Sequence, residues 1–361
     1  MKRKIFVAMS GGVDSSLAAA ILLQKGDDVV GITMRVWSGE ETDSTDIRPC
    51  CSERAARDAR DVAAHLSIQH YVVNYLEPFN RLVVDDFIAK YLHGETPNPC
   101  IRCNRFVKFG KLLDEAIALG ADYLASGHYA RIRKDESSGR FLLLKGVDTK
   151  KDQSYLLYAL SQHQLSRLIF PLGDLRKEET RRAAQELGLC VAHKKDSQEI
   201  CFIPEGDYRA FLKSHVPEMM TPGPILDVSG RELGQHQGLA LYTVGQRKGL
   251  RISTGKPLYV VRLDAEQNAI IVGPDSALYA SRLEARDVNW VAFDRPPERF
   301  RARVKIRYLH KEQDATVEPK ADDRASVCFD QPQRAITPGQ AAVFYDGDTV
   351  LGGCTITNTR E

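Results

Sequence analysis

The chain has 361 residues, 43% of them hydrophobic and 27% charged, which is the composition of an ordinary globular protein. One hydrophobic core rarely grows to this length, so we expect two or three domains, and a net charge of only +2 excludes nucleic-acid binding by bulk charge. No stretch approaches the ~20 apolar residues that span a bilayer and none has the form of a signal peptide, so we expect a cytoplasmic protein with no membrane contact.

The first half of the chain alternates strand and helix patterns. Buried strands are expected at 5–9, 29–34, 71–73 and 122–126, and helices at 15–25, 52–66, 79–91 and 105–119. This rhythm predicts an α/β domain at 1–207 with a doubly wound parallel sheet. Sheets of this kind bind ligands at the C-terminal edge of their strands.

The rhythm fades after about residue 207. Glycine and proline become dense at 221–224 and 244–249, and short alternating strands separated by turns follow from Tyr259. We therefore expect a small central domain at 208–275 and a C-terminal all-β barrel at 276–361.

The most specific local signal is the string Ser10-Gly11-Gly12-Val13-Asp14-Ser15-Ser16, which follows a strand and opens a helix. Its glycines let the backbone approach phosphates, and the helix N-terminus offers unpaired N–H groups. Asp14 is a candidate ligand for a Mg²⁺ ion that bridges phosphate oxygens. The alternative is a helix capped after a glycine turn.

No lysine follows the glycines, so this is not a Walker A loop. The string resembles the pyrophosphate-binding loop (PP-loop) of ATP pyrophosphatases, which share an adenine nucleotide alpha-hydrolase-like fold. The resemblance implies that the protein adenylates a carbonyl oxygen and releases pyrophosphate.

Eight cysteines occur, at positions 50, 51, 100, 103, 190, 201, 328 and 354. A large chain in a reducing compartment does not use them as a disulfide framework. Those at 100, 103 and 201 lie in polar, proline-rich or charged sequence and are candidate reactive thiols. Those at 190, 328 and 354 have apolar or small neighbours and are expected in the core. Cys50 and Cys51 match no motif.

Three of these thiols, Cys100, Cys103 and Cys201, belong to the motifs Thr96-Pro97-Asn98-Pro99-Cys100-Ile101-Arg102-Cys103-Asn104 and Asp196-Ser197-Gln198-Glu199-Ile200-Cys201-Phe202. Together with the loop at 10–16 and the strings at 126–131, 151–155 and 245–249, they resemble the tRNA-specific 2-thiouridylases over nearly the whole chain. The resemblance implies ATP-dependent replacement of the C2 oxygen of the wobble uridine of a tRNA by sulfur.

The resemblance also implies a sulfur relay. A sulfur-carrier protein or cysteine desulfurase loads a persulfide onto Cys201, whose sulfur attacks the adenylated C2, and AMP leaves. The nucleophile Cys103 then releases the sulfur from Cys201 and leaves a transient Cys103–Cys201 disulfide, a facile exchange for thiolates. Lys194 and Lys195 are near enough in sequence to lower the pKa of Cys201, and Arg102 that of Cys103.

The same resemblance assigns the binding residues. ATP contacts are expected at Ala8, Met9, Ser10, Gly11, Gly12, Val13, Asp14 and Ser15, with Met34 and Gly127 flanking the adenine. The target base is expected to border Asn98, Pro99 and Cys100. Contacts to tRNA are expected at His128, Lys151, Asp152, Gln153, Arg307, Tyr308 and Gln340. Two of these have structural alternatives, because Asp152 could cap a helix near Ser154 and His128 could be a hydrogen-bonded loop histidine.

A basic strand provides separate support for an RNA partner. Cations occupy every odd position from Arg299 to Arg307, and apolar residues occupy the even positions between them. A strand places these two sets on opposite faces. Five like charges repel one another and favour a polyanion, although a solvated outer face is the alternative.

Other hypotheses remain at this stage. Cys100, Cys103 and Cys201 could hold a [4Fe–4S] cluster, although we favour the relay because a disulfide-forming pair needs no metal. Another ATP pyrophosphatase-type ligase or amidotransferase would explain the loop but not the paired cysteines. A non-catalytic RNA-binding protein would explain the basic strand but not the loop.

Overall fold

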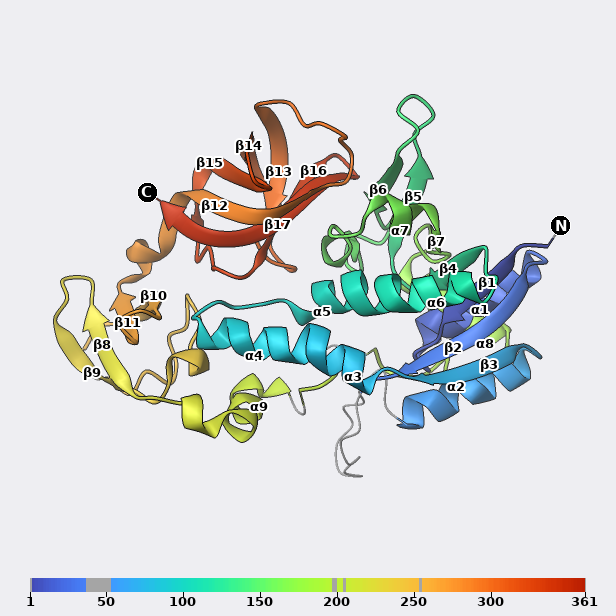
Figure 1. Ribbon diagram of the computed structural model, residues 1–361, viewed down its shortest axis with the longest axis horizontal. Coiled ribbons are helices and arrows are strands. Elements are labelled where there is room, and N and C mark those ends of the chain that lie inside the picture. Colours follow the sequence, from blue (N-terminus) through green and yellow to red (C-terminus); the bar gives the residue numbers. More distant parts are fainter. Residues whose placement is uncertain (1, 37–52, 197–199, 204–205, 253–254, 361) are drawn as a thin grey trace. The chain divides into compact units, whose positions relative to one another are not determined.

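A computed structural model describes residues 2–36, 53–196, 200–203, 206–252 and 255–360 (Figure 1). The chain divides into two units. Unit 1 comprises Met1–Val84, Pro99–Gly206 and Asp348–Val350, and unit 2 comprises Asp85–Asn98, Asp207–Gly347 and Leu351–Glu361. The segment Asp85–Asn98 therefore packs with the second half of the chain, although it lies within the first half in sequence.

The apolar runs of the first half form a five-stranded parallel sheet in unit 1, in the order β3-β2-β1-β4-β7. Its strands are β1 Lys4–Ala8, β2 Asp28–Arg35, β3 Gln69–Asn74, β4 Tyr123–Ser126 and β7 Leu168–Ile169. Strands buried on both faces need helices on both sides, which explains the continuous apolar runs of β1 and β2, whereas the edge strand β3 is largely exposed. The doubly wound parallel sheet expected from the sequence is confirmed.

The helices of unit 1 include α1 Val13–Gln24, α2 Glu53–His65, α3 Leu76–Phe79, α5 Pro99–Arg102, α6 Leu112–Ala118, α7 Gln162–Ser166 and α8 Lys177–Glu186. Two π-helical segments, Asn80–Val84 (η1) and Cys103–Lys111 (η2), interrupt what the sequence predicted as continuous helices, and η3 Ser154–Leu156 is a 3-10 turn. A hairpin of β5 Ala130–Lys134 and β6 Phe141–Lys145 completes the unit. In the described part of the chain, no helix has the length and apolar character to cross a membrane.

The order in which strands are added to the sheet reverses at β1. From β1 the chain adds β2 and β3 on one side and then returns to add β4 on the other. Ala8 at the end of β1 is in register with Ser126 at the end of β4, so the loops that follow these two strands begin side by side. A switch point of this kind is where doubly wound sheets bind their ligands.

Unit 2 begins with α4 Asp85–Leu92, which packs on α9 Tyr208–His215 through aromatic side chains. The rings of Tyr91 and Tyr208 stack with centroids 4.9 Å apart, and Phe87 meets Phe211 edge-on at 6.1 Å. A four-stranded sheet follows, in the order β10-β11-β8-β9. Its strands are β8 Gly223–Asp227, β9 Glu232–His236, β10 Tyr259–Asp264 and β11 Ala269–Gly273, with short turns of 3-10 helix at Pro217–Met219, Leu239–Leu241 and Asp275–Leu278.

The last strands form a closed six-stranded barrel, because the order β12-β15-β14-β13-β16-β17 returns to β12 through a β12–β17 pairing. The strands are β12 Tyr279–Trp290, β13 Phe300–Lys305, β14 Gln313–Lys320, β15 Arg324–Arg334, β16 Ala341–Asp346 and β17 Thr349–Arg360. Alternate side chains such as Val304, Val327 and Phe344 fill its core. The C-terminal barrel expected from the sequence is confirmed.

Two of the three cysteines expected in the core are exposed. Cys354 is buried, and this burial raises its pKa, but Cys190 and Cys328 are exposed. Cys328 lies on β15 between Val327 and Phe329, which both face the core. Because successive side chains of a strand point to opposite faces, apolar neighbours predict an exposed position rather than a buried one. Cys190 likewise lies between two buried residues.

Candidate active site at the nucleotide loop and cysteine segments

The loop between β1 and α1 depends on its two glycines. Gly11 has φ +64°, and a Cβ at this position would lie 2.2 Å from the carbonyl oxygen of Ala55 on α2. Gly12 is the N-cap of α1 and contributes no side chain there. The first N–H groups of α1 therefore meet no capping side chain at Gly12, as an anion-binding helix N-terminus requires.

The serines brace this loop from within. The backbone N–H of Ser10 donates to Ser15 Oγ at 3.1 Å. Ser15 Oγ and Ser16 Oγ both donate to the carbonyl oxygen of Gly12, at 3.2 Å and 2.8 Å. Ser15 and Ser16 are buried, so in this structure their hydroxyls order the loop.

Gly127 packs directly on the start of α1. A Cβ at Gly127 would lie 2.6 Å from both the carbonyl carbon of Asp14 and the nitrogen of Ser15, so only glycine fits. The structure thus joins Gly127 to the loop at 8–15 at the switch point of the sheet. Met34 lies buried near the end of β2, the strand next to β1.

Asp14 accepts hydrogen bonds from two buried residues. Lys177 Nζ donates to its two carboxylate oxygens at 2.7 Å and 2.8 Å, and Tyr129 Oη donates to Oδ1 at 2.8 Å. Tyr129 Oη also bonds Thr180 at 3.0 Å. Burial, followed by the charge of Asp14, raises the pKa of Tyr129, so the phenol stays protonated as a donor.

Lys177 also contacts Asp196, at the head of the motif that contains Cys201. Its Nζ lies 2.8 Å from Asp196 Oδ1, and Asp196 further pairs with Lys151 at 2.7 Å and with Arg181 at 2.7 Å. We call Asp14, Lys177, Asp196, Lys151 and Arg181 the buried charge cluster, after the buried Lys177 at its centre, since the other four side chains are 20–37% exposed. Its three cations face two carboxylates, so it carries an excess of positive charge beside the nucleotide loop.

The charge cluster lowers the pKa of Asp196, its second carboxyl group. Burial alone would raise the pKa of Asp196, but hydrogen bonds from Lys151 and Lys177 outweigh burial, and the pKa lies below its ordinary value. Asp196 is therefore ionised at neutral pH.

Sequence reasoning missed Lys177 as a site residue. It lies 163 positions from Asp14 and belongs to no motif. One local signal was available: Lys177 is the first residue of α8, where the helix dipole disfavours a cation. A lysine in this position suggests a compensating anion.

The nucleophile predicted from the sequence, Cys103, opens the π-helical segment η2. Just before it, Arg102 Nε donates to the carbonyl oxygen of Leu82 in η1 at 3.0 Å. Arg102 also lies over the ring of Phe106, at 4.8 Å. π-helical turns are rare and occur frequently at functional sites.

Cys201 is anchored beside the same region. The next residue, Phe202, is fully buried and packs edge-on against Phe79 of α3, with ring centroids 5.6 Å apart. Cys103 and Cys201 are both partly exposed thiols. The structure therefore attaches both cysteine-bearing segments to residues 76–84. Cys50 and Cys51 lie outside the described residues.

Lys194, expected to influence Cys201, makes its contacts at the nucleotide loop. Its Nζ donates to the carbonyl oxygen of Gly11 at 2.8 Å and to Asp58 on α2. This places another cation at the loop and ties it to α2.

Two metal sites were considered from the sequence, a Mg²⁺ ion at Asp14 and a [4Fe–4S] cluster at three cysteines. Within the described residues, no three His, Cys, Asp or Glu side chains gather as a metal site, so Cys100, Cys103 and Cys201 do not form a ligand set for a cluster here. Asp14 is a carboxylate of the kind that Mg²⁺ takes at nucleotide sites, and in this structure both of its oxygens are bonded to Lys177 Nζ.

His128, expected to touch tRNA, is buried with 9% of its surface exposed. Its Nδ1 shares a 2.8 Å hydrogen bond with Ser126 Oγ, and its ring packs between Phe109 and Phe170. Burial, helped by the charge of Lys108, holds its pKa well below the ordinary value, so it is neutral. This environment fits the alternative of a hydrogen-bonded loop histidine.

The string at 151–153 is also engaged within unit 1. Asp152 accepts from the backbone of Gly146 and from both the N–H and the hydroxyl of Ser154, and so orders the turn before η3. Gln153 Oε1 accepts from the backbone N–H of Tyr129 at 3.0 Å. Asp152 therefore orders the chain just before Ser154, although the N-cap of η3 is Gln153 and makes no side-chain cap bond.

The remaining expected RNA and base contacts divide between the units. Asn98 is in unit 2, whereas Pro99 and Cys100 begin α5 in unit 1, with Cys100 exposed.

In unit 2, Gln340 Nε2 donates to the carbonyl oxygen of Thr96 at 2.9 Å. Arg307 is exposed, donates to the carbonyl oxygen of Arg334 at 3.3 Å, and precedes the half-buried Tyr308.

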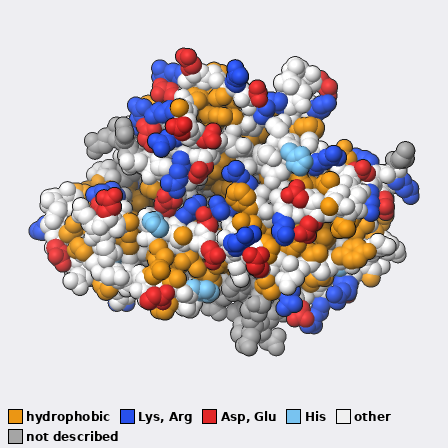
Figure 2. Space-filling model, viewed as in Figure 1, with side chains coloured by type: hydrophobic (Ala, Val, Ile, Leu, Met, Phe, Trp, Pro, Cys, Tyr) orange, Lys and Arg blue, Asp and Glu red, His pale blue; other side chains and the backbone are white. Residues whose placement is uncertain are grey.

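The alternation expected from the sequence holds over part of the basic segment. Along β13, Arg301 and Arg303 are exposed and Ala302 between them is buried, whereas Arg299 and Arg307 lie outside the strand. Both are ion-paired, Arg301 with Asp330 at 2.5 Å and Arg303 with Asp314 at 3.9 Å. Figure 2 shows acidic and basic side chains interspersed over the barrel. The stripe of cations is therefore partly neutralised by neighbouring strands.

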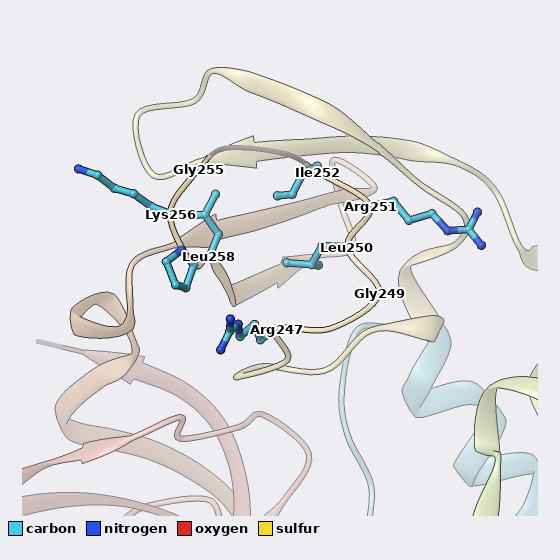
Figure 3. A pocket seen from close by; sticks show the side chains of 9 residues that line it. Arg247, Gly249, Leu250, Arg251, Ile252, Gly255, Lys256 and Leu258 are labelled. Atoms are coloured by element: carbon cyan, nitrogen blue, oxygen red, sulfur yellow. The ribbon is translucent and has the colours of Figure 1, made fainter.

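A separate hollow of about 470 Å³ lies in the central domain (Figure 3). It is lined by Arg247, Gly249, Leu250, Arg251, Ile252, Gly255, Lys256, Pro257 and Leu258. Arg251 and Lys256 point away from it on opposite sides. The hollow lies wholly within unit 2.

Comparisons with known proteins cover nearly the whole chain. Three family models match, a tRNA methyl transferase HUP domain at residues 3–205, a tRNA methyl transferase PRC-barrel domain at 209–274 and an aminomethyltransferase beta-barrel domain at 280–356.

Curated relatives match end to end. The tRNA-specific 2-thiouridylase MnmA of Carboxydothermus hydrogenoformans is 51% identical over 356 residues, which is 98% of each chain. The protein of the same name from Moorella thermoacetica is 53% identical over 355 residues, covering 98% of this chain and 99% of the relative. That of Magnetococcus marinus is 51% identical over 351 residues, covering 97% and 98%.

Proposed function

Because the chain belongs to the family of tRNA-specific 2-thiouridylases, we propose that it is an enzyme that replaces the C2 oxygen of the wobble uridine of tRNA by sulfur, at the expense of ATP. One observation in the structure carries the proposal beyond the family name. Lys177 joins Asp14 of the nucleotide loop to Asp196, which heads the Cys201 motif, so the ATP-binding and sulfur-bearing parts share one buried charge cluster.

The first half-reaction activates the base. The C2 oxygen of the uridine attacks the α-phosphorus of ATP, the bond between the α- and β-phosphates breaks, and pyrophosphate leaves. The N-terminus of α1 and the excess positive charge of the cluster suit the phosphates. Asp14 would hold Mg²⁺, which supplies charge neutralisation to the phosphates when bound.

The second half-reaction delivers sulfur. A sulfur-carrier protein or cysteine desulfurase supplies the terminal sulfur of a persulfide on Cys201. That sulfur attacks C2, and the C2–O bond breaks with departure of AMP. The Cys103 thiolate then attacks Cys201 Sγ, so the transferred sulfur leaves with its electron pair as the thiocarbonyl of the base. A thiol reductant, plentiful in the cytoplasm expected from the sequence, reopens the Cys103–Cys201 disulfide.

Reconstitution tests this proposal directly. The protein is supplied with ATP, Mg²⁺, a persulfide donor and an unmodified tRNA transcript. We expect 2-thiouridine at the wobble position by mass spectrometry, together with AMP and pyrophosphate. Products of ADP and phosphate would refute the assignment of the nucleotide loop.

Thiol variants separate the relay from other sulfur chemistry. Cys201→Ser and Cys103→Ser should each abolish persulfide-dependent thiolation. Cys328→Ser is the matched control, because that thiol is exposed on the barrel and takes no part. Full activity of the Cys201 variant would end the relay proposal.

The alternative that Cys100, Cys103 and Cys201 hold a [4Fe–4S] cluster has its own test. Cys100→Ser and wild type are purified anaerobically and assayed for iron and sulfide. The relay predicts active protein without stoichiometric iron. Iron at the level of a [4Fe–4S] cluster that disappears together with activity in Cys100→Ser would replace it.

A further inference from the structure

Two residues that precede the target-base segment are bonded to the barrel within unit 2. The backbone N–H of Thr96 donates to the carbonyl oxygen of Pro338 at 2.8 Å, and its carbonyl oxygen accepts from Gln340 Nε2 at 2.9 Å. Both main-chain polar groups of Thr96 are thus satisfied by one short stretch between β15 and β16.

Glu95 adds a second attachment, to a different strand. Arg286 of β12 places Nη2 2.9 Å from each carboxylate oxygen of Glu95. The Glu95 side chain is only 18% exposed, so this pair is less screened by solvent than an ordinary surface ion pair.

Close backbone approach completes the attachment. Gly339 has φ +87°, and a Cβ there would lie 2.7 Å from the nitrogen of Thr96 and 2.8 Å from Glu95 Cβ. A side chain at this position would collide with the segment it holds. Gly339 therefore serves the docking of residues 95 and 96 as well as its own turn.

The docking leaves one polar group unsatisfied. Among the described residues, Thr96 Oγ1 is buried and meets no hydrogen-bond partner. Burying a hydroxyl without a partner is unfavourable. The unpaired hydroxyl of Thr96 therefore does not stabilise this segment. The backbone hydrogen bonds of Thr96 and the ion pair of Glu95 with Arg286 fix its conformation.

The link from Thr96 to the nucleophile segment is short and stiff. The sequence Thr96-Pro97-Asn98-Pro99-Cys100 contains two prolines, whose φ angles are fixed. Thr96 and Asn98 each precede a proline and are restricted to extended conformations. A constraint applied at Thr96 is therefore transmitted along the chain with little slack.

We propose that Arg286 and Gln340 are positioning residues, which fix Glu95 and Thr96 and thereby orient Asn98, the part of the target-base segment that belongs to unit 2. This inference rests on the proposed function, since it takes Asn98 to border the uridine. It gives Gln340 a role distinct from the tRNA contact expected by resemblance. A contact residue changes tRNA affinity, whereas a positioning residue changes turnover at saturating tRNA.

Kinetics distinguish the two roles. Arg286→Ala should lower kcat for thiolation roughly tenfold or more, in line with the cost of misplacing reacting groups by about 1 Å, and leave the Kd for tRNA within about twofold. Gln340→Ala should lower kcat in the same way. The double variant Glu95→Arg with Arg286→Glu restores the ion pair in reverse and should recover most of the lost kcat. An unchanged kcat in Arg286→Ala, or a rise in Kd alone, would overturn the proposal.

A pair of glycine substitutions controls for backbone strain. Gly339→Ala and Gly347→Ala both place a side chain at positive φ, but only the first meets the 95–96 segment, because a Cβ at Gly347 has open space. Gly339→Ala should lose kcat and Gly347→Ala should retain it. Equal losses would indicate strain in the barrel rather than loss of positioning.

Hydrogen exchange tests the attachment without relying on activity. Peptides covering residues 93–104 should exchange faster in Arg286→Ala than in wild type, and should be unchanged in Lys320→Met, which removes an exposed barrel ion pair. Unchanged exchange in Arg286→Ala overturns the positioning role. A wild-type protein that makes no 2-thiouridine overturns the proposed function instead, and the exchange result still decides the positioning role.

Discussion

The charge cluster of unit 1 and the basic strand of the barrel are built from the same residue types but differ in burial. Lys177, Asp14 and Asp196 have side chains 9%, 32% and 20% exposed. Arg301 and Asp330 on the barrel are 58% and 49% exposed. Charges removed from water must keep their partners, so the cluster fixes a geometry, whereas exposed pairs contribute about 0–1 kcal/mol each and can exchange partners.

This difference assigns the two regions different tasks. The cluster holds the nucleotide loop against the head of the Cys201 motif, where a rigid arrangement serves catalysis. The barrel strand carries exposed arginines paired with Asp330 and Asp314, and we expect a phosphate to displace these partners. Five alternating cations suggested a bare positive stripe, but acidic residues of β14 and β15 moderate it.

The largest expected effect comes from breaking the buried cluster. Lys177→Met removes the group that, among the described residues, bonds both carboxylates, and leaves Asp14 and Asp196 poorly compensated. We expect the free energy of unfolding to fall by about 3–5 kcal/mol and adenylation to be lost. Urea unfolding and pyrophosphate release measure the two effects.

The matched control is Lys320→Met, which removes a lysine paired with Glu284 at 2.8 Å and 42% exposed. This variant should lose less than about 1 kcal/mol. Similar losses in the two variants would show that burial does not separate the regions.

The pH dependence of stability sharpens the comparison further. The pKa of Asp196 is lowered from its ordinary value of 3.8, so its ionised form stabilises the folded state above that value, and this contribution is lost as pH falls through the lowered pKa. Asp196→Asn lacks the contribution. The difference in urea midpoint between wild type and Asp196→Asn should be largest near neutral pH and narrow below about pH 4. A constant difference would contradict the assigned role of this carboxylate.

On the barrel, the combined change of Arg301, Arg303 and Lys305 to serine should weaken tRNA binding without unfolding the protein. Its salt dependence should flatten by up to about 0.7–0.9 log unit for each lost phosphate contact. Filter binding at several salt concentrations measures the slope. The same slope as wild type would mean that this face is only solvated.

The smallest expected effect comes from releasing one arginine of that strand. Asp330→Asn removes the carboxylate that accepts both Nη atoms of Arg301. If the strand binds RNA, tRNA affinity should rise slightly, with a salt slope steeper by at most about 0.9 log unit. Weaker binding would indicate that the ion pair orders Arg301 for its contact.

Much of the fold could be predicted from the sequence because it depends on the local periodicity of apolar residues. Alternating strand and helix patterns identified the parallel sheet, and the alternation along β13 identified a strand with one charged face. The glycines of the nucleotide loop were recognisable because they are adjacent in sequence. Cys328 was predicted to be buried because its neighbours are apolar. In a strand, however, apolar neighbours face the core and the residue between them faces outward.

Other features were decided by tertiary structure alone. Lys177 meets Asp14 across 163 residues, and Thr96 meets Gln340 across 244, through strand order and barrel closure. The aromatic packing of α4 on α9 moved Asp85–Asn98 into unit 2, although its helical pattern resembles that of its neighbours. Local sequence determines which faces of an element are apolar, but the partner of each face depends on how all elements pack. The sequence therefore identified the glycine loop between β1 and α1 and proposed the thiols, while only the folded chain decided which charges and backbone groups surround them.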